Sequence, residues 1–270
     1  MSKQDVNNLP LTDFSTTDVL TVAIAMPVFN ESQGIVKTLT DLDRELAKAE
    51  IRVELFLQDD CSTDSTLLLV EELRHKLAMR LSIESNKQNS GHGPTTQRAY
   101  VRASHSSDSI ILQLDSDGQY NTSQLPELLR TCRLSNSIVI GCRSYREEPW
   151  YRKCITSALR FYLFLRWHRK FSDANSPIRV YPRQTLKKLL TSLPSKSLIP
   201  NIYLTIVSSV QEAPVIEIPV EHKVRNGESL IGTMWSDKKS RVVFVPRKLV
   251  RFCLTAFVEL RRFERELLTK

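Results

Sequence analysis

Short apolar runs alternate with longer amphipathic segments along the first half of this chain. The runs are rich in β-branched and aliphatic residues, which predicts buried strands. They begin at Thr21, Val53, Leu81, Ile110 and Ser137. After the first run, Ile35, Leu39, Leu42 and Leu46 recur at the spacing of one helix face. Strands that alternate with helices in this way predict an α/β fold, with a mostly parallel sheet and helices on both faces.

Two acidic residues follow the fourth predicted strand directly, in Leu112-Gln-Leu-Asp-Ser-Asp-Gly-Gln119. Side chains alternate along an extended chain, so Asp115 and Asp117 can project the same way at the end where open α/β sheets bind ligands. Crowded carboxylates repel each other unless a cation lies between them. Their oxygens, with that of Gln119, suit Mg²⁺ or Mn²⁺ that also grips a diphosphate. Taken alone, Asp-x-Asp is equally compatible with a solvated loop or a helix cap.

Polar loops also follow the other predicted strands. The first strand ends at Asn30-Glu31, and the third leads to Asn89-Ser-Gly-His-Gly-Pro94. The second ends in Asp59-Asp-Cys-Ser-Thr-Asp-Ser-Thr66, where Ser62, Thr63 or Asp64 can cap a helix that starts near Ser65. Each of these loops can be a plain turn, and His92 alone is more typical of a structural contact than of a ligand.

In this order, the motifs Pro27-x-Phe29-Asn-Glu31, Asp59 to Thr66, Gly91-His-Gly93 and Asp115-x-Asp-x-Gln119 resemble a family-two glycosyltransferase with the Rossmann-like, A-type nucleotide-sugar fold. Later segments resemble the polyprenyl-phosphate branch of that family, which includes dolichyl-phosphate mannose synthase. These segments are Gly141-Cys-Arg143, Trp150 to Thr156, Asp173 to Tyr181 and Arg225-Asn-Gly-Glu-Ser229. The resemblance covers about residues 20 to 232.

The resemblance implies a role for each matching residue. The donor nucleotide sugar, with guanosine or uridine as its base, would be bound by Pro27, Phe29, Glu31, Asp60, Gly91, Gly93, Asp115 and Ser229, with Asp60 reading the base. The metal ligands would be Asp115, Asp117 and Gln119. The lipid phosphate would be held by Arg143, Arg152 and Thr156, and the residues acting in transfer would be Asp117, Arg143, Arg152 and Arg225. This chain departs from the family at Ser176-Pro-Ile178, where relatives have Ser-Gly-Phe, and at Leu230, where many have lysine.

The acceptor is indicated by a missing residue type. A sugar hydroxyl acceptor needs a general base, whereas a phosphate monoester is already largely ionised near neutral pH. This chain has no Asp or Glu between Asp173 and Glu212. We therefore expect a lipid phosphate acceptor and a single displacement that inverts the anomeric centre. A soluble acceptor (a glycan, a metabolite or a protein) and a catalytically silent nucleotide-sugar-binding scaffold stay open as alternatives.

Composition and charge refine this interpretation. Five cysteines without pairing or metal spacing suit reduced thiols in the cytoplasm, and no run approaches the roughly 20 apolar residues of a membrane span. The net charge of +8 is compatible with anionic lipid or a phosphorylated substrate, and no nucleic-acid-binding module accompanies it. We expect a loose tail without a signal peptide over 1–19, a catalytic domain over 20–235 and a basic amphipathic helix over 236–270.

Apolar and basic residues share two predicted helices. From Pro246 to Lys270, an apolar stripe that includes Phe252, Phe257 and Leu260 is flanked by arginines, and the segment 155–169 has a similar mixture. Basic amphipathic helices with aromatic residues can lie in a membrane interface. The same stripes can instead pack on the core or form a homodimer contact, so peripheral membrane binding and dimerisation are both expectations here.

Overall fold

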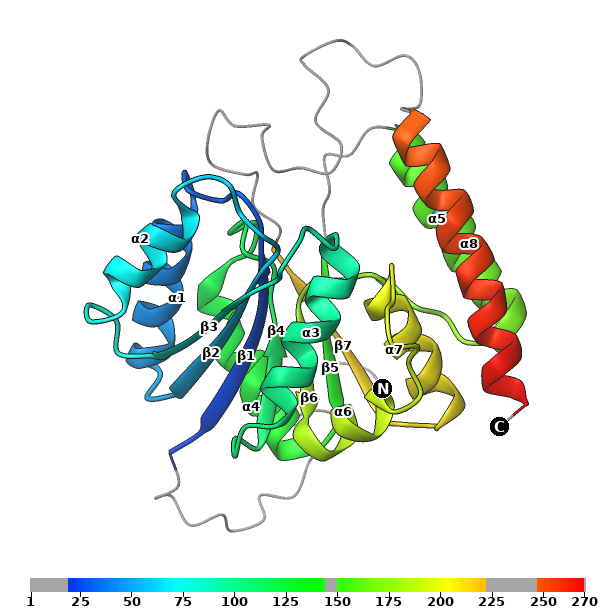
Figure 1. Ribbon diagram of the computed structural model, residues 1–270. Coiled ribbons are helices and arrows are strands. Elements are labelled where there is room, and N and C mark those ends of the chain that lie inside the picture. Colours follow the sequence, from blue (N-terminus) through cyan, green and yellow to red (C-terminus); the bar gives the residue numbers. More distant parts are fainter. Residues whose placement is uncertain (1–18, 144–149, 222–246, 270) are drawn as a thin grey trace.

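The computed structural model describes residues 19–143, 150–221 and 247–269, and a seven-stranded sheet forms its centre (Figure 1). The strands are β1 (Thr21–Val28), β2 (Arg52–Asp59), β3 (Arg80–Ser85), β4 (Ile110–Gln113), β5 (Ile138–Arg143), β6 (Arg179–Pro182) and β7 (Val215–Val220). The five strands expected from the apolar runs are all present.

The strand order in the sheet is β3-β2-β1-β4-β6-β5-β7. The pairs β1·β2, β2·β3, β1·β4 and β5·β7 are parallel, as expected. Strand β6 is antiparallel to both β4 and β5, and it had not been predicted as a strand. Because the four parallel pairings bring their strand ends to one edge, the polar loops after β1, β2, β3 and β4 meet there.

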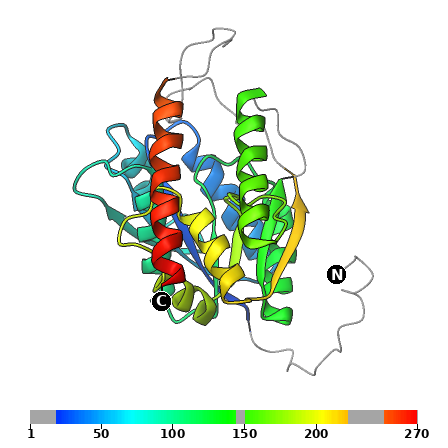
Figure 2. The same ribbon diagram turned by 90° about the vertical axis from the view of Figure 1, so that its right-hand side faces the viewer.

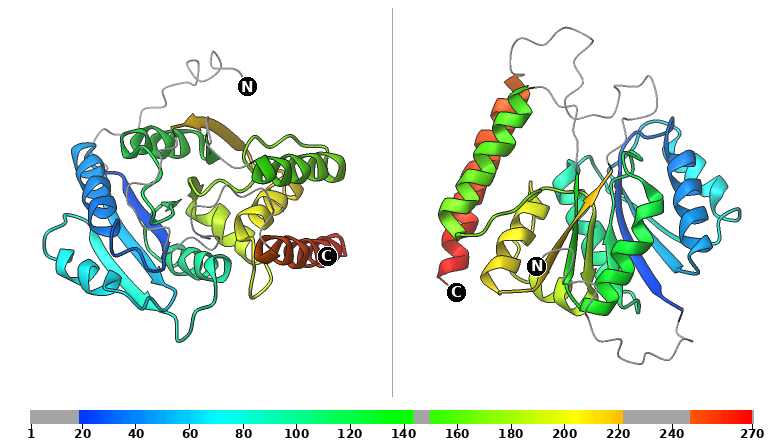
Figure 3. Two further views of the ribbon diagram at one scale, coloured as in Figure 1. Left: turned by 90° about the horizontal axis from the view of Figure 1, so that it is seen from above. Right: turned by 180° about the vertical axis from the view of Figure 1, so that it is seen from behind.

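Helices cover both faces of the sheet, and each face has its own apolar core. The helices are α1 (Ile35–Lys48), α2 (Thr66–Leu73), α3 (His92–Ser104), α4 (Leu125–Ser135), α5 (Trp150–Trp167), α6 (Arg183–Leu190), α7 (Pro200–Val210) and α8 (Arg247–Leu268), with a short 3-10 helix η2 (Thr122–Gln124). Helices α1, α2 and α4 pack on one face, where Leu39 and Leu129 are fully buried. Helices α3, α6 and α7 pack on the other, as the view from behind in Figure 3 makes clear.

Helices α5 and α8 lie side by side outside α7 (Figure 2). Tyr162 of α5 contacts Phe257 of α8, and Trp167 donates from Nε1 to Glu264, so the two helices run in the same direction. Phe263 of α8 stacks on Tyr203 of α7, with ring centroids 4.4 Å apart. One face of α8 therefore packs on the second core, which favours the packing alternative for that face only.

A buried carboxylate joins the two helices. Glu264 is 1% exposed, and its oxygens accept hydrogen bonds from the Tyr162 hydroxyl and from Trp167 Nε1 at 3.1 Å. Arg261 donates to the Tyr162 hydroxyl at 3.1 Å and lies 3.5 Å from Glu264. The donors Tyr162 and Trp167 are half-buried, and both depend on this one carboxylate, so Glu264 is the polar anchor of this helix pair.

Replacing Glu264 by alanine should loosen α5 and α8 without unfolding the sheet, because two half-buried donors, Tyr162 and Trp167, lose their acceptor. Hydrogen exchange measured by mass spectrometry should become faster in residues 150–167 and 247–268 and stay unchanged in β1 and β4. Glu266→Ala is the control, since Glu266 on the same helix is exposed and pairs with Arg262 alone among the described residues. Equal exchange in both variants would contradict the anchoring role.

Candidate functional site

A cavity of about 1220 Å³ opens at the carboxyl ends of the strands. Its wall includes every predicted site residue whose side chain the structure describes: Pro27, Phe29, Glu31, Asp60, Gly91, Gly93, Asp115, Asp117, Gln119, Arg143 and Thr156. Arg225 and Ser229 lie outside the described residues, as does the side chain of Arg152. The structure thus brings residues from five strand ends and α5 to one place, while the role of each remains a prediction.

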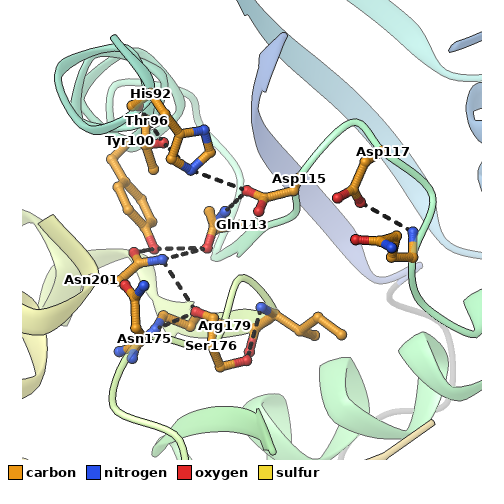
Figure 4. Close-up of polar contacts among 12 residues, drawn as sticks. His92, Thr96, Tyr100, Gln113, Asp115, Asp117, Asn175, Ser176, Arg179 and Asn201 are labelled. Carbon is orange, nitrogen blue, oxygen red and sulfur yellow. Dashed lines mark hydrogen bonds and ion pairs between the residues drawn. The ribbon is translucent and has the colours of Figure 1, made fainter. Parts of the chain in front are cut away.

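The acidic pair lies at the floor of this cavity, directly after β4. Oδ1 of Asp115 accepts a hydrogen bond from Gln113 Nε2 at 3.0 Å and lies 3.6 Å from His92 Nε2 (Figure 4). Oδ1 of Asp117 accepts from the backbone N–H of Gln119 at 3.1 Å. The chain turns at Gly118, between Asp117 and Gln119, and its φ of +66° suits glycine. A Cβ atom at position 118 would also lie 2.7 Å from Thr38 Oγ1. Both the backbone conformation and the lack of space therefore favour glycine there.

The electrostatics of the pair suit a cation. Burial raises the pKa of Asp115, and the neighbouring Asp117 carboxylate raises it further, while His92, Arg143 and the Gln113 hydrogen bond act in the opposite direction. No group of three His, Cys, Asp or Glu side chains forms a metal cage in the part of the chain that the structure describes. Two carboxylates are nevertheless what a protein offers to Mg²⁺ or Mn²⁺ when substrate phosphates complete the coordination. The residues present therefore fit such an ion.

Asp60 stands at the end of β2 and organises the loop that precedes α3. Its two oxygens accept hydrogen bonds from Asn86 Nδ2 at 2.7 Å and from the backbone N–H groups of Ser90 and Gly91 at 2.7 and 2.8 Å. Gly91 has a φ of +86°, which lets the backbone turn toward this carboxylate. Asp60 thus shapes the cavity wall in this structure, and its contact with a nucleobase stays a prediction.

The loop after β2 differs slightly from the prediction that Ser62, Thr63 or Asp64 caps the next helix. The N-cap residue of α2 is Ser65, without a side-chain capping bond. Oδ1 of Asp64 instead accepts from the backbone N–H of Thr66 at 3.0 Å, which forms a turn just before the helix. Its other oxygen accepts from the N–H of Ser32 at 3.1 Å, which fastens this loop to the one that follows β1.

Arg143 lies at the end of β5 with a side chain that is 13% exposed. Its Nε and Nη2 atoms donate to the two oxygens of Asp173, at 2.7 and 3.1 Å, and Nη2 also donates to the Asn175 carbonyl at 3.2 Å. A surface cation would be far more exposed, so this arginine is held in place. Three of its N–H groups are engaged by the loop of residues 173–175, and the same arginine lines the cavity.

Sequence reasoning missed two buried polar residues beside the acidic pair. Gln113 on β4 is fully buried, and Asn201 on α7 is 6% exposed. Glutamine inside the apolar run Ile110 to Leu114 was a visible signal, since a core strand seldom carries an amide without a partner. Nothing in the sequence of α7 pointed to Asn201, because its partner lies 88 residues away.

A family model covers the same part of the chain. Residues 23–190, more than half of the chain, match Glycosyl transferase family 2. The protein is a glycosyltransferase, and it belongs to glycosyl transferase family 2.

Two relatives by sequence show how far the similarity extends. An uncharacterised protein of Methanocaldococcus jannaschii is 27% identical over 172 residues, which are 61% of this chain and 72% of the relative. The undecaprenyl-phosphate 4-deoxy-4-formamido-L-arabinose transferase of Edwardsiella ictaluri is 24% identical over 225 residues, 83% of this chain and 66% of the relative. This chain thus spans slightly less than two thirds of that transferase.

Solved structures of related shape agree on the fold. The mannosyl-3-phosphoglycerate synthase of Rubrobacter xylanophilus matches with a TM-score of 0.59 and 16% identity, over 92% of this chain and 75% of that one. A mannosyltransferase of Pyrobaculum calidifontis, solved with GDP-Man and Mn²⁺, matches with a TM-score of 0.54 and 16% identity, over 77% and 57% of the two chains. At such identities the likeness shows the fold alone, which is the expected A-type glycosyltransferase fold.

Replacing Asp115 by asparagine should stabilise the metal-free protein at neutral pH. The pKa of Asp115 is raised in the folded chain. The protonated carboxyl is therefore tolerated at acidic pH, and the free energy of unfolding falls as the pH rises through the pKa of the folded state. In chelator, Asp115→Asn should therefore raise the melting temperature at pH 7.5, with a gain that shrinks toward pH 4. Asp108→Asn, the same change outside the cavity, controls for one lost charge. A lower melting temperature for Asp115→Asn at pH 7.5 would contradict the expected sign.

Proposed function

We propose that this protein is a metal-dependent, inverting glycosyltransferase that moves a sugar from a nucleoside diphosphate sugar to a polyprenyl phosphate at a membrane surface. One observation carries the proposal. The same cavity that contains the acidic pair and Arg143 continues between α5 and α8, where its wall is apolar. That wall includes Leu159, Leu249, Phe252, Ala256, Phe257 and Leu260. The undecaprenyl-phosphate transferase that this chain resembles supports the same acceptor class.

The donor half of the cavity is polar. Asp115 and Asp117 would hold Mg²⁺ or Mn²⁺, which when bound neutralises the charge that develops on the leaving diphosphate. Pro27, Phe29 and Glu31 stand after β1, on the wall that would face the base and ribose. His92 Nε2 lies 3.6 Å from Asp115 Oδ1, and this side chain would also contact a donor phosphate. The donor base, uridine or guanosine, is left to experiment.

The acceptor half needs positive charge rather than a base. A phosphate monoester acceptor is already ionised, so it needs orientation and charge stabilisation. Arg143 would supply both, because its guanidinium is fixed by Asp173 and can offer Nη1 to a phosphate oxygen. Asp173 lines the cavity and is a candidate general base, yet both its oxygens accept hydrogen bonds from Arg143. This engagement weighs against a hydroxyl acceptor.

A soluble acceptor is the second candidate. A small phosphorylated metabolite could use the same arginine, but it would leave the apolar wall between α5 and α8 in contact with water. Covering apolar surface is favourable by about 25 cal/mol per Å², so a long isoprenoid chain fits that wall better.

The outer faces of α5 and α8 support contact with a membrane surface. Large apolar side chains outside the cavity wall are exposed on both helices: Phe161, Phe164 and Leu165 on α5, and Val258 and Leu268 on α8. Arg247, Lys248 and Arg251 are exposed at the first turns of α8. No helix among the described residues is long and apolar enough to cross a bilayer. We infer that the pair lies in the interface of an anionic membrane, at its cytoplasmic face, where the five free cysteines would stay reduced.

The transfer reaction tests the proposed function directly. Purified protein is incubated with Mn²⁺, a panel of radiolabelled UDP- and GDP-sugars, and undecaprenyl phosphate in detergent. We expect labelled product in the organic extract with one donor class, none with free polyprenol, and none with chelator. Arg143→Lys should lower this transfer by roughly tenfold, because lysine cannot hold Asp173 and a phosphate oxygen together.

Two controls accompany that assay. Arg183→Lys makes the same change at a half-buried arginine outside the cavity, which donates to the Ser106 carbonyl, and it should leave transfer unchanged. Slow hydrolysis of the donor by water should survive in Arg143→Lys, because it needs the metal site and not the acceptor. Efficient transfer to a soluble sugar or to phosphoglycerate, with undecaprenyl phosphate inert, would overturn the acceptor proposal.

Membrane contact is tested with single substitutions on the outer face of the helix pair. Phe161 and Val258 are 63% and 66% exposed and lie outside the cavity wall. Phe161→Ser and Val258→Ser should each weaken co-sedimentation with phosphatidylglycerol vesicles by about threefold to tenfold, and high salt should weaken it further. Leu68→Ser on α2 is the control, at the same 63% exposure. If both variants bind vesicles normally but no longer dimerise, this face is a homodimer contact.

A further inference from the structure

A connected set of buried polar groups adjoins the acidic pair. Gln113 of β4, Tyr100 of α3 and Asn201 of α7 meet there (Figure 4). The Tyr100 hydroxyl donates to Asn201 Oδ1 at 2.9 Å, and Asn201 Nδ2 donates to Gln113 Oε1 at 3.3 Å. Gln113 Nε2 then donates to Asp115 Oδ1 at 3.0 Å. Three elements of the fold are thus joined to one carboxylate.

The charge of Asp115 fixes the direction of every bond in this set. A carboxylate can only accept, so the Gln113 amide must turn its NH₂ group toward Asp115 and its oxygen toward Asn201. Asn201 must therefore present Nδ2 to Gln113 and Oδ1 to Tyr100. Burial raises the pKa of Tyr100 well above its ordinary value, so the hydroxyl keeps its proton and can donate. Each group has a single orientation that satisfies its neighbours.

The same asparagine also contacts the segment between α5 and β6. Asn201 Nδ2 also donates to the Ser176 carbonyl at 3.2 Å, and Arg179 Nε donates to that carbonyl at 2.9 Å. Ser176 belongs to the loop that carries Asp173, and Asp173 holds Arg143. A continuous path of hydrogen bonds therefore runs from Asp115, through Gln113 and Asn201, to the loop that orients Arg143.

An apolar core would not need this arrangement. Methionine at 113 and leucine at 201 would fill similar volumes, and burying two amides is unfavourable unless all their hydrogen bonds are made. Polar partners of metal-binding carboxylates are known to set ligand orientation, and their loss typically lowers metal affinity about tenfold to a hundredfold. The position of Gln113, two residues before Asp115 on the same strand, suits that task.

We propose that Gln113 and Asn201 are positioning residues that form an amide relay between the two halves of the site. The relay holds Asp115 in the orientation that a donor-bound cation requires, and it ties that orientation to the loop that places Arg143. Gln113 does not line the cavity, and Asn201, which does, turns its amide group toward Tyr100, Gln113 and the Ser176 carbonyl. The inference rests on the proposed function, because it takes Asp115 as a cation ligand.

Calorimetric titration of Mn²⁺ in the presence of saturating UDP or GDP, whichever the wild type binds, tests the relay without measuring turnover. Gln113→Met should raise the Mn²⁺ dissociation constant by about tenfold. Asn201→Leu, which does not touch Asp115, should raise it about threefold to fivefold, and the double variant should be no weaker than Gln113→Met alone, because both act through one bond. Both single variants should also raise the Michaelis constant for undecaprenyl phosphate.

Gln97→Met is the matched control. Gln97 of α3 is also buried, and its amide bridges the Pro194 carbonyl and the N–H of Ser197, outside the relay. It should lower the melting temperature as Gln113→Met does and leave Mn²⁺ binding unchanged. If Gln113→Met fails to fold, Tyr100→Phe is the alternative variant, because it removes only the hydroxyl that orients Asn201. We expect Tyr100→Phe to raise the Mn²⁺ dissociation constant about twofold to threefold.

Two results would overturn the relay, and they are distinguishable. If the wild type binds Mn²⁺ with nucleotide and Gln113→Met binds it equally well despite a lower melting temperature, the amides serve stability alone and the proposed function stands. If the wild type shows no Mn²⁺ binding with any nucleotide, the metal assignment of Asp115 fails, and the relay fails with it.

Discussion

The carboxylates of Asp115 and Asp117 follow a fully buried strand, and their mutual repulsion is the constraint around which the site is arranged. Burial raises the pKa of Asp115, so the folded chain carries an acidic group that is more easily protonated than a solvated aspartate. His92, Gln113 and Arg143 offset part of this cost from three different elements. A bound cation would offset the remainder, which links metal affinity to the stability of the strand end itself.

Arg143 extends the same electrostatic argument to the other half of the cavity. It favours the ionised form of Asp115, and the group that holds it directly is the carboxylate of Asp173. A guanidinium anchored by its own carboxylate keeps a fixed direction when the donor is absent. Preorganised charge of this kind is effective in transfer reactions because no reorganisation is needed when the transition state forms.

Much of the fold was accessible from the sequence because its signals are local. The buried stripe of α1 and the polar loops at the strand ends depend on residues a few positions apart, and the structure agrees with them. The four-residue strand β6 is different: its antiparallel pairing with β4 joins residues about 70 positions apart and leaves no periodic pattern. The roles of Glu264 and Asn201 could not be predicted for the same reason, since their partners lie on other helices and strands. The side chains predicted for the donor and acceptor do share one cavity, although the spacing of the motifs could not have indicated its apolar extension toward α8.

Buried polar groups occur at two places around this cavity. Glu264 joins α5 to α8, whereas Gln113 and Asn201 adjoin the acidic pair. Both break the rule that a core is apolar, and both are fully satisfied, so each costs little as long as every partner stays in place. Because every partner is required, these groups hold their surroundings in a fixed position. An apolar substitute would tolerate small shifts of α8 or of Asp115, and a hydrogen-bonded amide or carboxylate does not. The fold thus uses directional bonds at the two places where a lipid phosphate and a nucleotide sugar would need their binding surfaces held in a fixed relation.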